Sequence, residues 1–310
     1  MTRRPGGRPG GRSEPPLVGR YMTDRSRTSV PNSARTANHA VRVGRMPTSI
    51  WLWSAEDVLH RDVLSEEERQ RAAALREPLG AHFTAARVAV RTILADLLGV
   101  PGGDIVLGNH PCPGCGDAGH GPPRVVWPET SLWISMSRSE GYGALAVSTA
   151  AVGVDIETHR PVDLPGLSLS ALAPAEVAWL DGLTEPRERL LGFYRCWTRK
   201  EAVLKAVGVG MSVDLRRWDT EPEAERGRVR DTTSSPARLW TVENPPPLPD
   251  TTVAVSRPAG STAGEGDVSV TRYPSAPEPA ISQAWHLAAL PPGSLGRSTT
   301  LREFRALKEM

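Results

Sequence analysis

Two of the three lysines in this 310-residue chain lie five residues apart, although 34 of its 37 basic residues are arginines. Lys200 and Lys205 belong to the segment WTRKEAVLK at residues 197–205, which also contains Glu201. A lysine ammonium is a compact point charge that suits phosphate oxygens and can shift its pKa. If the segment is helical, Trp197, Glu201 and Lys205 share one face. This spacing leaves two interpretations open. The ammonium groups could bind phosphate, or Glu201 and Lys205 could form an exposed ion pair worth about 0.3–0.5 kcal/mol.

Two carboxylates lie upstream in a segment that predicts a β-strand, GVDIE at residues 153–157. Alternation along a strand places Asp155 and Glu157 on one face and Val154 and Ile156 on the other. Neighbouring carboxylates repel each other unless a cation lies between them or one of them is protonated. An oxygen-only pair suits Mg²⁺ better than Zn²⁺. The alternative is that both carboxylates belong to a solvated strand face.

Together, the two segments resemble motifs of the 4′-phosphopantetheinyl transferase superfamily, in the longer, pseudodimeric branch typified by the surfactin-type enzymes. The resemblance rests on GVDIE at 153–157, WTRKEAVLK at 197–205 and GVG at 208–210. Weaker matches occur at 173–176 and at 64–69. The resemblance implies an α+β fold of two similar α/β halves packed as a pseudodimer, with the active site in the cleft between them.

The resemblance also implies an activity and a set of site residues. The expected reaction transfers 4′-phosphopantetheine from coenzyme A to a serine of an apo acyl or peptidyl carrier protein, with Mg²⁺, and releases 3′,5′-ADP. Asp155, Glu157 and Glu201 are implied as metal ligands. Glu201 is further implied as the general base, directly or through a water, and Lys205 as a phosphate contact that stabilises the leaving group. Phosphoryl transfer needs mainly positioning and charge neutralisation, which these groups can supply.

One departure from the family pattern lies in the predicted coenzyme A contact. Many members have a Ser-His-Ser turn whose histidine contacts a coenzyme A phosphate, and here Ser137-Arg138-Ser139 has an arginine at that position. A guanidinium also binds phosphate, even bidentately, so Ser137 and Arg138 remain candidate contacts. Arg87 and Arg91, one helical turn apart, are further candidates for the nucleotide 3′-phosphate. Their alternative is an exposed basic helix face.

A second departure is the sequence Gly121-Pro122-Pro123, where the family has Gly-Lys-Pro or Gly-Arg-Pro. Proline cannot replace that cation, although Arg124 is close enough to compensate. Together with Arg138, this change keeps open a second hypothesis, in which the fold is retained but coenzyme A turnover is altered or lost.

The cysteines suggest a third hypothesis. The segment HPCPGC at residues 110–115, followed by His120, contains four possible zinc ligands within eleven residues. The usual structural zinc site draws its second ligand pair from farther along the chain, so we expect a Pro- and Gly-rich loop with two reduced thiols. A zinc-stabilised binding module stays as the alternative. Cys196 and Trp197 are expected to be core residues, the role of Lys200 stays open, and the odd cysteine count predicts no disulfide framework.

Helices and strands that would position these residues follow from hydrophobic periodicity and capping signals. Predicted strands cover 48–53, 133–136, 143–148, 152–156, 239–242 and 252–255. Predicted helices cover 65–76, 82–98, a segment from 174 and 187–207, with a short one near 300–308. Helix-strand-strand order in each half favours α+β over a regular βαβ series.

Composition predicts four regions, and 39% apolar residues suffice for one large core or two modest ones. The four predicted regions are a disordered basic arm over 1–47, an N-terminal half over 48–150, a C-terminal half over 151–257 and a loose linker and tail over 258–310. The arm holds ten arginines against two acids. It could contact nucleic acid or an acidic carrier protein, or the natural start could be Met22 or Met46. Nucleic acid and membrane are not the expected partners, and a cytoplasmic monomer is expected.

Overall fold

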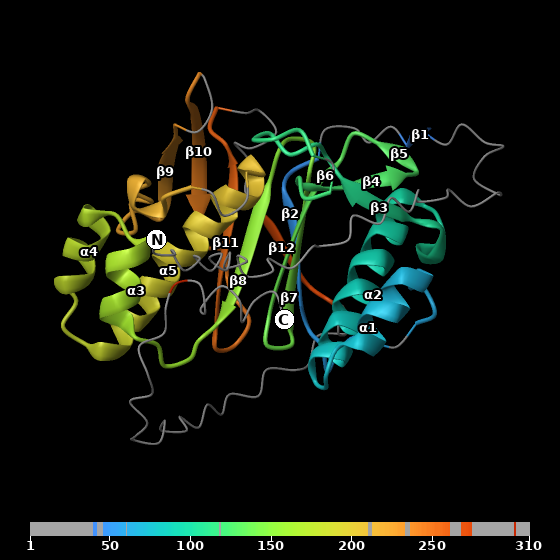
Figure 1. The fold of residues 1–310 in the computed structure, drawn as a ribbon, viewed down its shortest axis with the longest axis horizontal. Helices are drawn as coiled ribbons and strands as arrows, with labels where there is room; N and C mark the ends of the chain where they lie inside the picture. The colour runs from blue at the N-terminus through green and yellow to red at the C-terminus, as the bar shows by residue number, and fades with distance from the viewer. Residues whose placement is uncertain are drawn as a thin grey trace, which may run out of the picture.

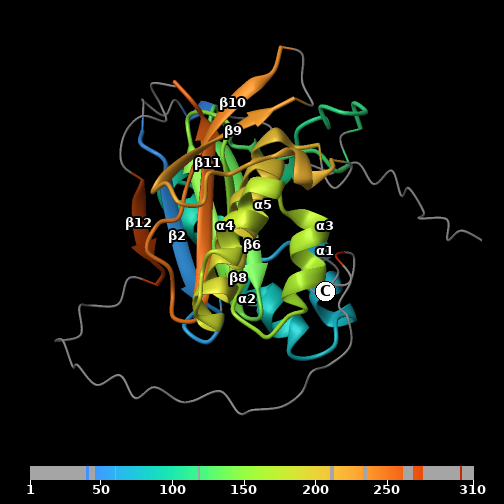
Figure 2. The same cartoon turned by 90° about the vertical axis from the view of Figure 1, so that its left-hand side faces the viewer.

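The computed structural model describes residues 40–41, 46–59, 61–117, 119–209, 213–232, 236–260, 268–274 and 301. Helices α3 to α5 cover one side of the strands and helices α1 and α2 lie on the opposite side, as Figures 1 and 2 show. The helices are α1 (Glu66–Ala74), α2 (Leu79–Leu98), α3 (Leu164–Ala171), α4 (Pro174–Asp181) and α5 (Pro186–Val207). The expected mixture of helices and strands is therefore confirmed.

Two four-stranded sheets occupy the centre of the molecule. The first has the order β12-β2-β7-β6 and the second has the order β8-β11-β10-β9. The first consists of β2 (Ser49–Ser54), β6 (Trp133–Ser139), β7 (Tyr142–Ser148) and β12 (Ser269–Arg272). The second consists of β8 (Gly153–Thr158), β9 (Arg226–Asp231), β10 (Arg238–Glu243) and β11 (Thr251–Pro258). Two short pairs complete the strands, β1 (Ala40–Val41) with β5 (Glu129–Thr130), and β3 (Val106–Asn109) with β4 (Pro123–Trp127).

Local sequence explains how the central hairpin forms. Strands β6 and β7 are joined by Glu140 and Gly141, with φ of 45° and 87°. Positive φ at both central residues is the requirement of the type I′ turn, whose twist matches that of the flanking strands. Because Ser139 then pairs with Tyr142, the register of the whole hairpin is fixed.

The long helices begin and end where capping chemistry permits. Helix α1 has a capping box, in which Ser65 accepts the Glu68 N–H and Glu68 accepts the Ser65 N–H. Helices α2 and α5 end at Gly99 and Gly208, which adopt φ of 67° and 79°. Glycine takes this left-handed conformation without the usual steric cost, so both helices stop there.

An apolar layer joins the two sheets. Its buried side chains come from β2 and β7 of the first sheet and from β8 and β11 of the second, namely Ile50, Leu52, Ala144, Ala146, Val154, Ile156, Val253 and Val255. A separate core lies under α2, and another under α5. Burying this apolar surface stabilises the molecule by about 25 cal/mol per Å² and holds the edge strands β6 and β8 together.

Serine side chains connect β6 to β8 where no backbone ladder joins them. Ser135 Oγ accepts the Val154 N–H at 3.0 Å, and Ser139 Oγ accepts the Thr158 N–H at 3.1 Å. Buried backbone donors need partners, so these hydroxyls satisfy groups that the junction would otherwise leave unpaired. We refer to this junction of β6 and β8 as the strand seam.

Several sequence expectations need correction. The linker expected from residue 258 is wrong for β12, which pairs in parallel with β2 and so returns the chain to the first sheet. Strands β3, β4 and β9 and helix α3 were not expected, and α2 begins three residues earlier than expected, at Leu79. The basic arm is described only at 40–41 and 46–47, where β1 pairs with β5. The helix expected near 300–308 lies outside the described residues except for Leu301, which is helical.

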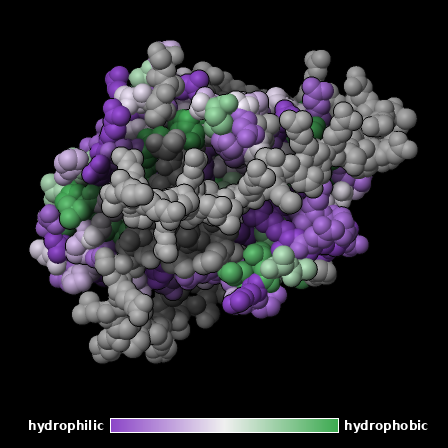
Figure 3. Space-filling view, in the orientation of Figure 1, coloured by the Kyte–Doolittle hydropathy of each residue, from purple (hydrophilic) through white to green (hydrophobic). Residues whose placement is uncertain are grey.

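Neither helical layer contains a membrane span. Among the residues that the structure describes, no helix is long and apolar enough to cross a bilayer. On the face drawn in Figure 3, hydrophilic side chains cover part of the α1 and α2 side, next to a smaller hydrophobic patch. Helix α1 accordingly has Glu66, Glu67 and Arg69 exposed.

Candidate active site

The two predicted carboxylates of β8 are buried in the strand seam. Asp155 is 0% exposed and Glu157 is 2% exposed. Ser137 Oγ donates to Asp155 Oδ1 at 2.9 Å, and Ser139 Oγ donates to Glu157 Oε2 at 3.2 Å. The prediction that both carboxylates share one face is confirmed, since both contact β6. The alternative of a solvated strand face is wrong, because both side chains are buried.

Helix α5 contacts the same carboxylates from the other side. Lys205 Nζ lies 2.8 Å from Asp155 Oδ1, and Trp197 Nε1 donates to Glu157 Oε1 at 2.7 Å. Close packing of α5 on β8 permits these contacts, because a Cβ on Gly153 would lie 1.8 Å from the Ala202 carbonyl oxygen. The helical face predicted for Trp197 and Lys205 is therefore the face that meets the carboxylates.

Glu201 lies on the same face of α5, one turn from each of these residues. It is 9% exposed, and with Lys205 it lines a pocket of about 190 Å³. The opposite wall comes from Ser135 and Met136 of β6, and a third wall comes from the loop before β4. A carboxylate and an ammonium thus face a cavity beside the strand seam.

The donor set at this site fits a hard divalent cation. Asp155, Glu157 and Glu201 supply only oxygen ligands, and each is at most 9% exposed. Burying several carboxylates together is unfavourable unless cations compensate their charge. Mg²⁺ is bound by carboxylate oxygens in preference to nitrogen or sulfur ligands. Their oxygens do not all lie within 4.8 Å of one another in the described structure, so Mg²⁺ binding by these three residues stays a prediction that rests on their chemistry.

The contacts of Trp197 and Ser139 with Glu157 were not expected from the sequence. Trp197 is fully buried, as expected of a core residue, but its indole N–H also fixes Glu157. Ser139 is the second serine of the Ser-Arg-Ser segment and bonds the same carboxylate. The i, i+2 spacing of both the serines and the carboxylates was the available signal, because two strands with this period can pair side chains along a shared face.

Arg138 lies on the opposite face of β6 from the serines. Its guanidinium carbon lies 5.3 Å from the centre of the Phe83 ring, and that of Arg71 lies 5.4 Å from the same ring. Burial lowers the pKa of Arg138, and the charges of Arg71 and Arg87 lower it further. The structure thus places two arginines, Arg71 and Arg138, against one aromatic ring of α2, with the charge of Arg87 close to Arg138. A phosphate contact by Arg138 or Ser137 stays a prediction.

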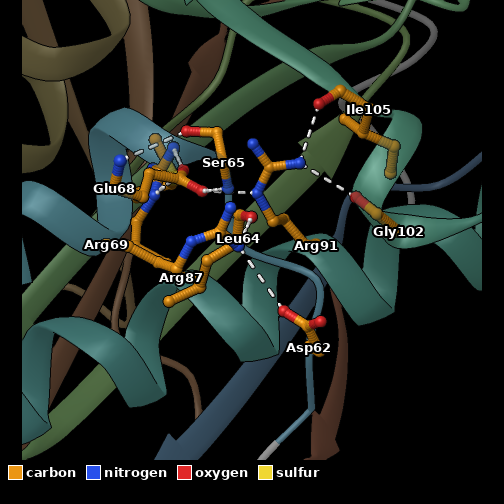
Figure 4. Close-up of polar contacts among 10 residues, drawn as sticks. Asp62, Leu64, Ser65, Glu68, Arg69, Arg87, Arg91, Gly102 and Ile105 are labelled. Atoms are coloured by element: carbon orange, nitrogen blue, oxygen red, sulfur yellow. Dashed lines mark hydrogen bonds and ion pairs between the residues drawn. The ribbon is translucent and has the colours of Figure 1, made fainter.

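Arg87 and Arg91 both meet Glu68, as Figure 4 shows. Arg91 Nε donates to Glu68 Oε2 at 2.6 Å, and Arg91 Nη1 donates to the carbonyl oxygens of Gly102 and Ile105 at 2.9 and 2.7 Å. The exposed basic helix face is therefore a wrong alternative, since the Arg91 side chain is only 4% exposed. Arg91 joins α1, α2 and the following turn through these contacts. The coenzyme A contact of Arg91 stays a prediction.

Arg87 has a more accessible position than Arg91. Its side chain is 20% exposed, and Nη1 lies 3.7 Å from the sulfur of Met136, which lines the pocket. Burial lowers the pKa of Arg87, while the charge of Glu68 opposes that shift. Arg87 stays a predicted coenzyme A contact, with Glu68 as its partner in the structure described here.

Lys200, whose role the sequence left open, belongs to the core. Its Nζ lies 2.7 Å from Glu176 Oε2 and donates to the Leu215 carbonyl oxygen at 2.8 Å, and both charged side chains are fully buried. Glu176 also accepts the Thr220 hydroxyl at 2.6 Å. This pair fixes α4 and the turn before β9 against α5. Cys196, as expected, is buried.

Comparison with known proteins agrees with this geometry. The family model of the 4′-phosphopantetheinyl transferase superfamily matches residues 151–254, which include β8, α5 and all three carboxylates. The protein slr0495 of Synechocystis sp. is 32% identical over 54% of this chain and 68% of its own length. The 4′-phosphopantetheinyl transferase HetI of Nostoc sp. is 32% identical over 45% of this chain and 59% of its own length.

A third relative is the 4′-phosphopantetheinyl transferase psf-1 of Bacillus pumilus, 30% identical over 49% of this chain and 61% of its own length. The chain thus spans about three fifths of the length of HetI and psf-1. It belongs to the 4′-phosphopantetheinyl transferase superfamily, whose members use coenzyme A as substrate. The resemblance to this superfamily and the expected enzyme class are confirmed, whereas the surfactin-type branch stays a prediction.

Proposed function

We propose that the chain transfers the 4′-phosphopantetheine group of coenzyme A to a serine of an apo acyl or peptidyl carrier protein and releases 3′,5′-ADP. The observation that carries this proposal is the meeting of β8 and α5 at the strand seam. There Lys205 Nζ lies 2.8 Å from Asp155 Oδ1, beside a pocket that Glu201 and Lys205 both line. Phosphoryl transfer needs positioned charge more than covalent chemistry, and this arrangement supplies it.

Glu201 is proposed as the general base because it faces the pocket. The carrier serine oxygen would attack the phosphorus that bears pantetheine, and its proton would pass to the Glu201 carboxylate, directly or through a water. The bond between that phosphorus and the oxygen of the 3′,5′-ADP group would break. Glu201 lies at the pocket wall with 9% exposure, which keeps it accessible to a substrate while limiting its contact with water.

Lys205 is proposed to stabilise the charge that develops on the leaving phosphate. Its side chain is 26% exposed, whereas its partner Asp155 is fully buried. The ammonium therefore lies between the buried carboxylate and the pocket, where a phosphate oxygen could approach. Asp155 in turn restrains the ammonium, so less rotamer freedom is lost when a phosphate binds.

Asp155, Glu157 and Glu201 are proposed to hold Mg²⁺, which when bound would neutralise charge on the pyrophosphate of coenzyme A and polarise its phosphoryl oxygens. The hydroxyl of Ser139 and the indole of Trp197 hold opposite oxygens of Glu157. Such outer contacts orient a ligating carboxylate and raise its affinity for the ion. The Ser137 hydroxyl has the equivalent role for Asp155.

The two sheet-and-helix units are proposed as the related halves of a pseudodimer of the surfactin-type branch. Each unit has a four-stranded sheet and one long helix, α2 of 20 residues and α5 of 22 residues. The strand seam lies between them, where that branch would place its cleft. A monomer and a cytoplasmic location, both predicted from the sequence, belong to this proposal.

An intact-mass assay tests the proposal. Purified full-length protein is incubated with coenzyme A, Mg²⁺ and a panel of apo carrier proteins, and each carrier is weighed for an added phosphopantetheine. We expect a mass gain that EDTA abolishes and that Glu201→Gln reduces by about 100-fold or more. Lys205→Ala should also fail, and Lys205→Arg should keep a small part of the activity.

The controls separate the competing outcomes. Glu188→Gln, a change of the same type in the first turn of α5, should leave the rate unchanged. No mass gain on any carrier, with coenzyme A still bound, would instead favour the altered-turnover hypothesis that Arg138 and Pro122 raise. No gain and no binding would refute the proposed activity.

A further inference from the structure

A second cluster of metal-ligand side chains lies in the loop between β3 and β4. Cys112, Cys115 and His120 each offer one ligand atom, and these atoms all lie within 4.8 Å of one another. Cys115 Sγ lies 3.3 Å from His120 Nε2. Sulfur and nitrogen ligands of one tetrahedral zinc ion lie about 3.5 Å apart, given their usual bond lengths. The three side chains are therefore spaced like ligands of a shared zinc ion.

The CPGCG backbone folds around the Cys112 sulfur. The backbone N–H groups of Gly114 and Cys115 hydrogen-bond to the Cys112 sulfur. Gly116 N–H donates to the Cys112 carbonyl oxygen at 2.8 Å, and Gly116 adopts φ 77°, a conformation that favours glycine. The turn therefore holds the Cys112 sulfur in a fixed position close to the ligand atoms of Cys115 and His120.

We propose that Cys112, Cys115 and His120 bind one zinc ion and that Asp117 offers a carboxylate for the fourth position. Asp117 Oδ2 lies 4.0 Å from His120 Nε2, while its Oδ1 accepts the Gly119 N–H at 2.7 Å. Two thiolates, an imidazole and a carboxylate form a donor set that suits tetrahedral zinc. The oxygen-only carboxylates of the strand seam suit a harder ion, so the two sites select different metals.

The zinc site adjoins the pocket of the proposed active site. His120 and Pro122 line the pocket that contains Glu201 and Lys205. The Cys112 sulfur lies 3.7 Å from the Gly208 carbonyl oxygen at the end of α5. A zinc ion would thus brace a loop that forms one pocket wall. Because that pocket is the proposed coenzyme A site, an effect of zinc on coenzyme A binding rests on the proposed function, whereas the zinc site itself does not.

Contact between the loop and α5 is close. A Cβ on Gly208 would lie 2.3 Å from Pro122 Cγ, so a larger side chain would displace the loop. The proline that replaces the family's cation therefore packs against the helix end. Loop position, and with it the shape of the pocket, depends on this contact and on the proposed zinc ligands.

Metal analysis of the full-length protein tests the zinc site. The protein is expressed without a histidine tag in zinc-supplemented medium, and bound metal is measured by inductively coupled plasma mass spectrometry. We expect about one zinc per chain in the wild type, and less than about a tenth of that in Cys115→Ser. Cys196→Ala, which removes a buried cysteine elsewhere, should keep the zinc.

Cobalt provides a second measurement that does not depend on a variant. Titration of metal-free wild-type protein with Co²⁺ should produce a thiolate-to-cobalt charge-transfer band and the strong visible bands of a four-coordinate ion. Wild-type protein without zinc and without these bands would overturn the proposal. So would Cys115→Ser protein that folds, judged by near-ultraviolet circular dichroism, and retains the wild-type zinc content. Neither measurement involves carrier modification, so failure of the zinc site is distinguishable from failure of the proposed function.

Discussion

Glu157 is held from two directions by groups that differ in chemistry. The Ser139 hydroxyl comes from β6, and the Trp197 indole N–H comes from α5. The two donors meet different oxygens of one buried carboxylate, so its plane is fixed before any ligand binds. Such preorganisation matters most for a metal ligand, because a misoriented oxygen weakens coordination.

Replacing Trp197 with Phe tests this positioning role. The substitution keeps a large aromatic ring in the core but removes the hydrogen bond to Glu157. We expect the Mg²⁺ concentration for half-maximal carrier modification to rise about 10- to 100-fold, as for other outer contacts of metal ligands. The measurement is the transfer rate as a function of Mg²⁺ concentration.

Trp240→Phe is the matched control, since Trp240 of β10 is buried in the same core cluster. It should alter stability by a similar amount and leave the Mg²⁺ dependence unchanged. If both variants show the same Mg²⁺ dependence, Trp197 has only a packing role.

At the scale of elements, helix α5 is attached to its surroundings by an ion pair away from the proposed active site. Lys200 and Glu176 are both fully buried, and their side chains lie 2.7 Å apart. Burial lowers the pKa of Lys200, and the charge of Glu176 opposes this shift. A buried charge without its partner is costly, so the pair makes the placement of α4 on α5 specific.

Lys200→Met should therefore destabilise the protein by about 3–5 kcal/mol, because it leaves the Glu176 carboxylate buried without its ammonium. The double variant Lys200→Met, Glu176→Gln should recover part of that loss. Urea unfolding measures both. Activity per folded molecule should stay near the wild-type value. A single variant that costs less than about 1 kcal/mol would contradict this account.

The packing of α1 on α2 predicts a defined pH dependence. Burial acts to raise the pKa of Glu68, but the charges of Arg87 and Arg91 outweigh it, and the pKa of Glu68 is lowered. As the pH falls below 4.5, the ordinary pKa of a glutamate, the unfolded chain therefore binds more protons than the folded chain. The stabilising contribution of Glu68 is fully present above that pH and is lost as the pH falls through the lowered value.

The free energy of unfolding of the wild type and of Glu68→Gln, measured from pH 7 to pH 3 by urea titration, checks this prediction. The difference between them should be about 3 kcal/mol at pH 7 and should shrink below about pH 4.5. Glu67→Gln, on the exposed side of the same helical turn, should show no comparable change. A wild-type advantage that stays constant down to pH 3 would contradict the assignment.

At the scale of the whole molecule, local patterns predicted the main elements but not their contacts. Helix α5 and strand β8 were predictable because periodicity and caps are local signals. The burial of Arg91 was not predicted, because periodicity identifies a helix face but not the element that covers it, which here is α1. Strand β12 was missed because it has only four residues and its partner β2 lies more than 200 residues away.

The candidate site was also predictable within single elements but not between them. Spacing along one element predicted that Asp155 and Glu157 share a face of β8, and that Glu201 and Lys205 share a face of α5. That β6 contacts β8 through serine hydroxyls depends on how two sheets pack. The approach of Cys115 to His120 depends on the turn geometry of a loop. Sequence spacing alone specifies neither contact.

The central claim is that the carboxylates of the strand seam bind coenzyme A through a divalent ion. Isothermal titration of coenzyme A into the wild type and into Asp155→Asn, each with and without Mg²⁺, tests it most directly. Asparagine preserves the shape of the side chain but removes its charge. We predict that Mg²⁺ strengthens coenzyme A binding at least about 10-fold in the wild type and has little effect in Asp155→Asn. Equal affinities with and without Mg²⁺ in the wild type, or an undiminished Mg²⁺ effect in Asp155→Asn, would contradict the claim.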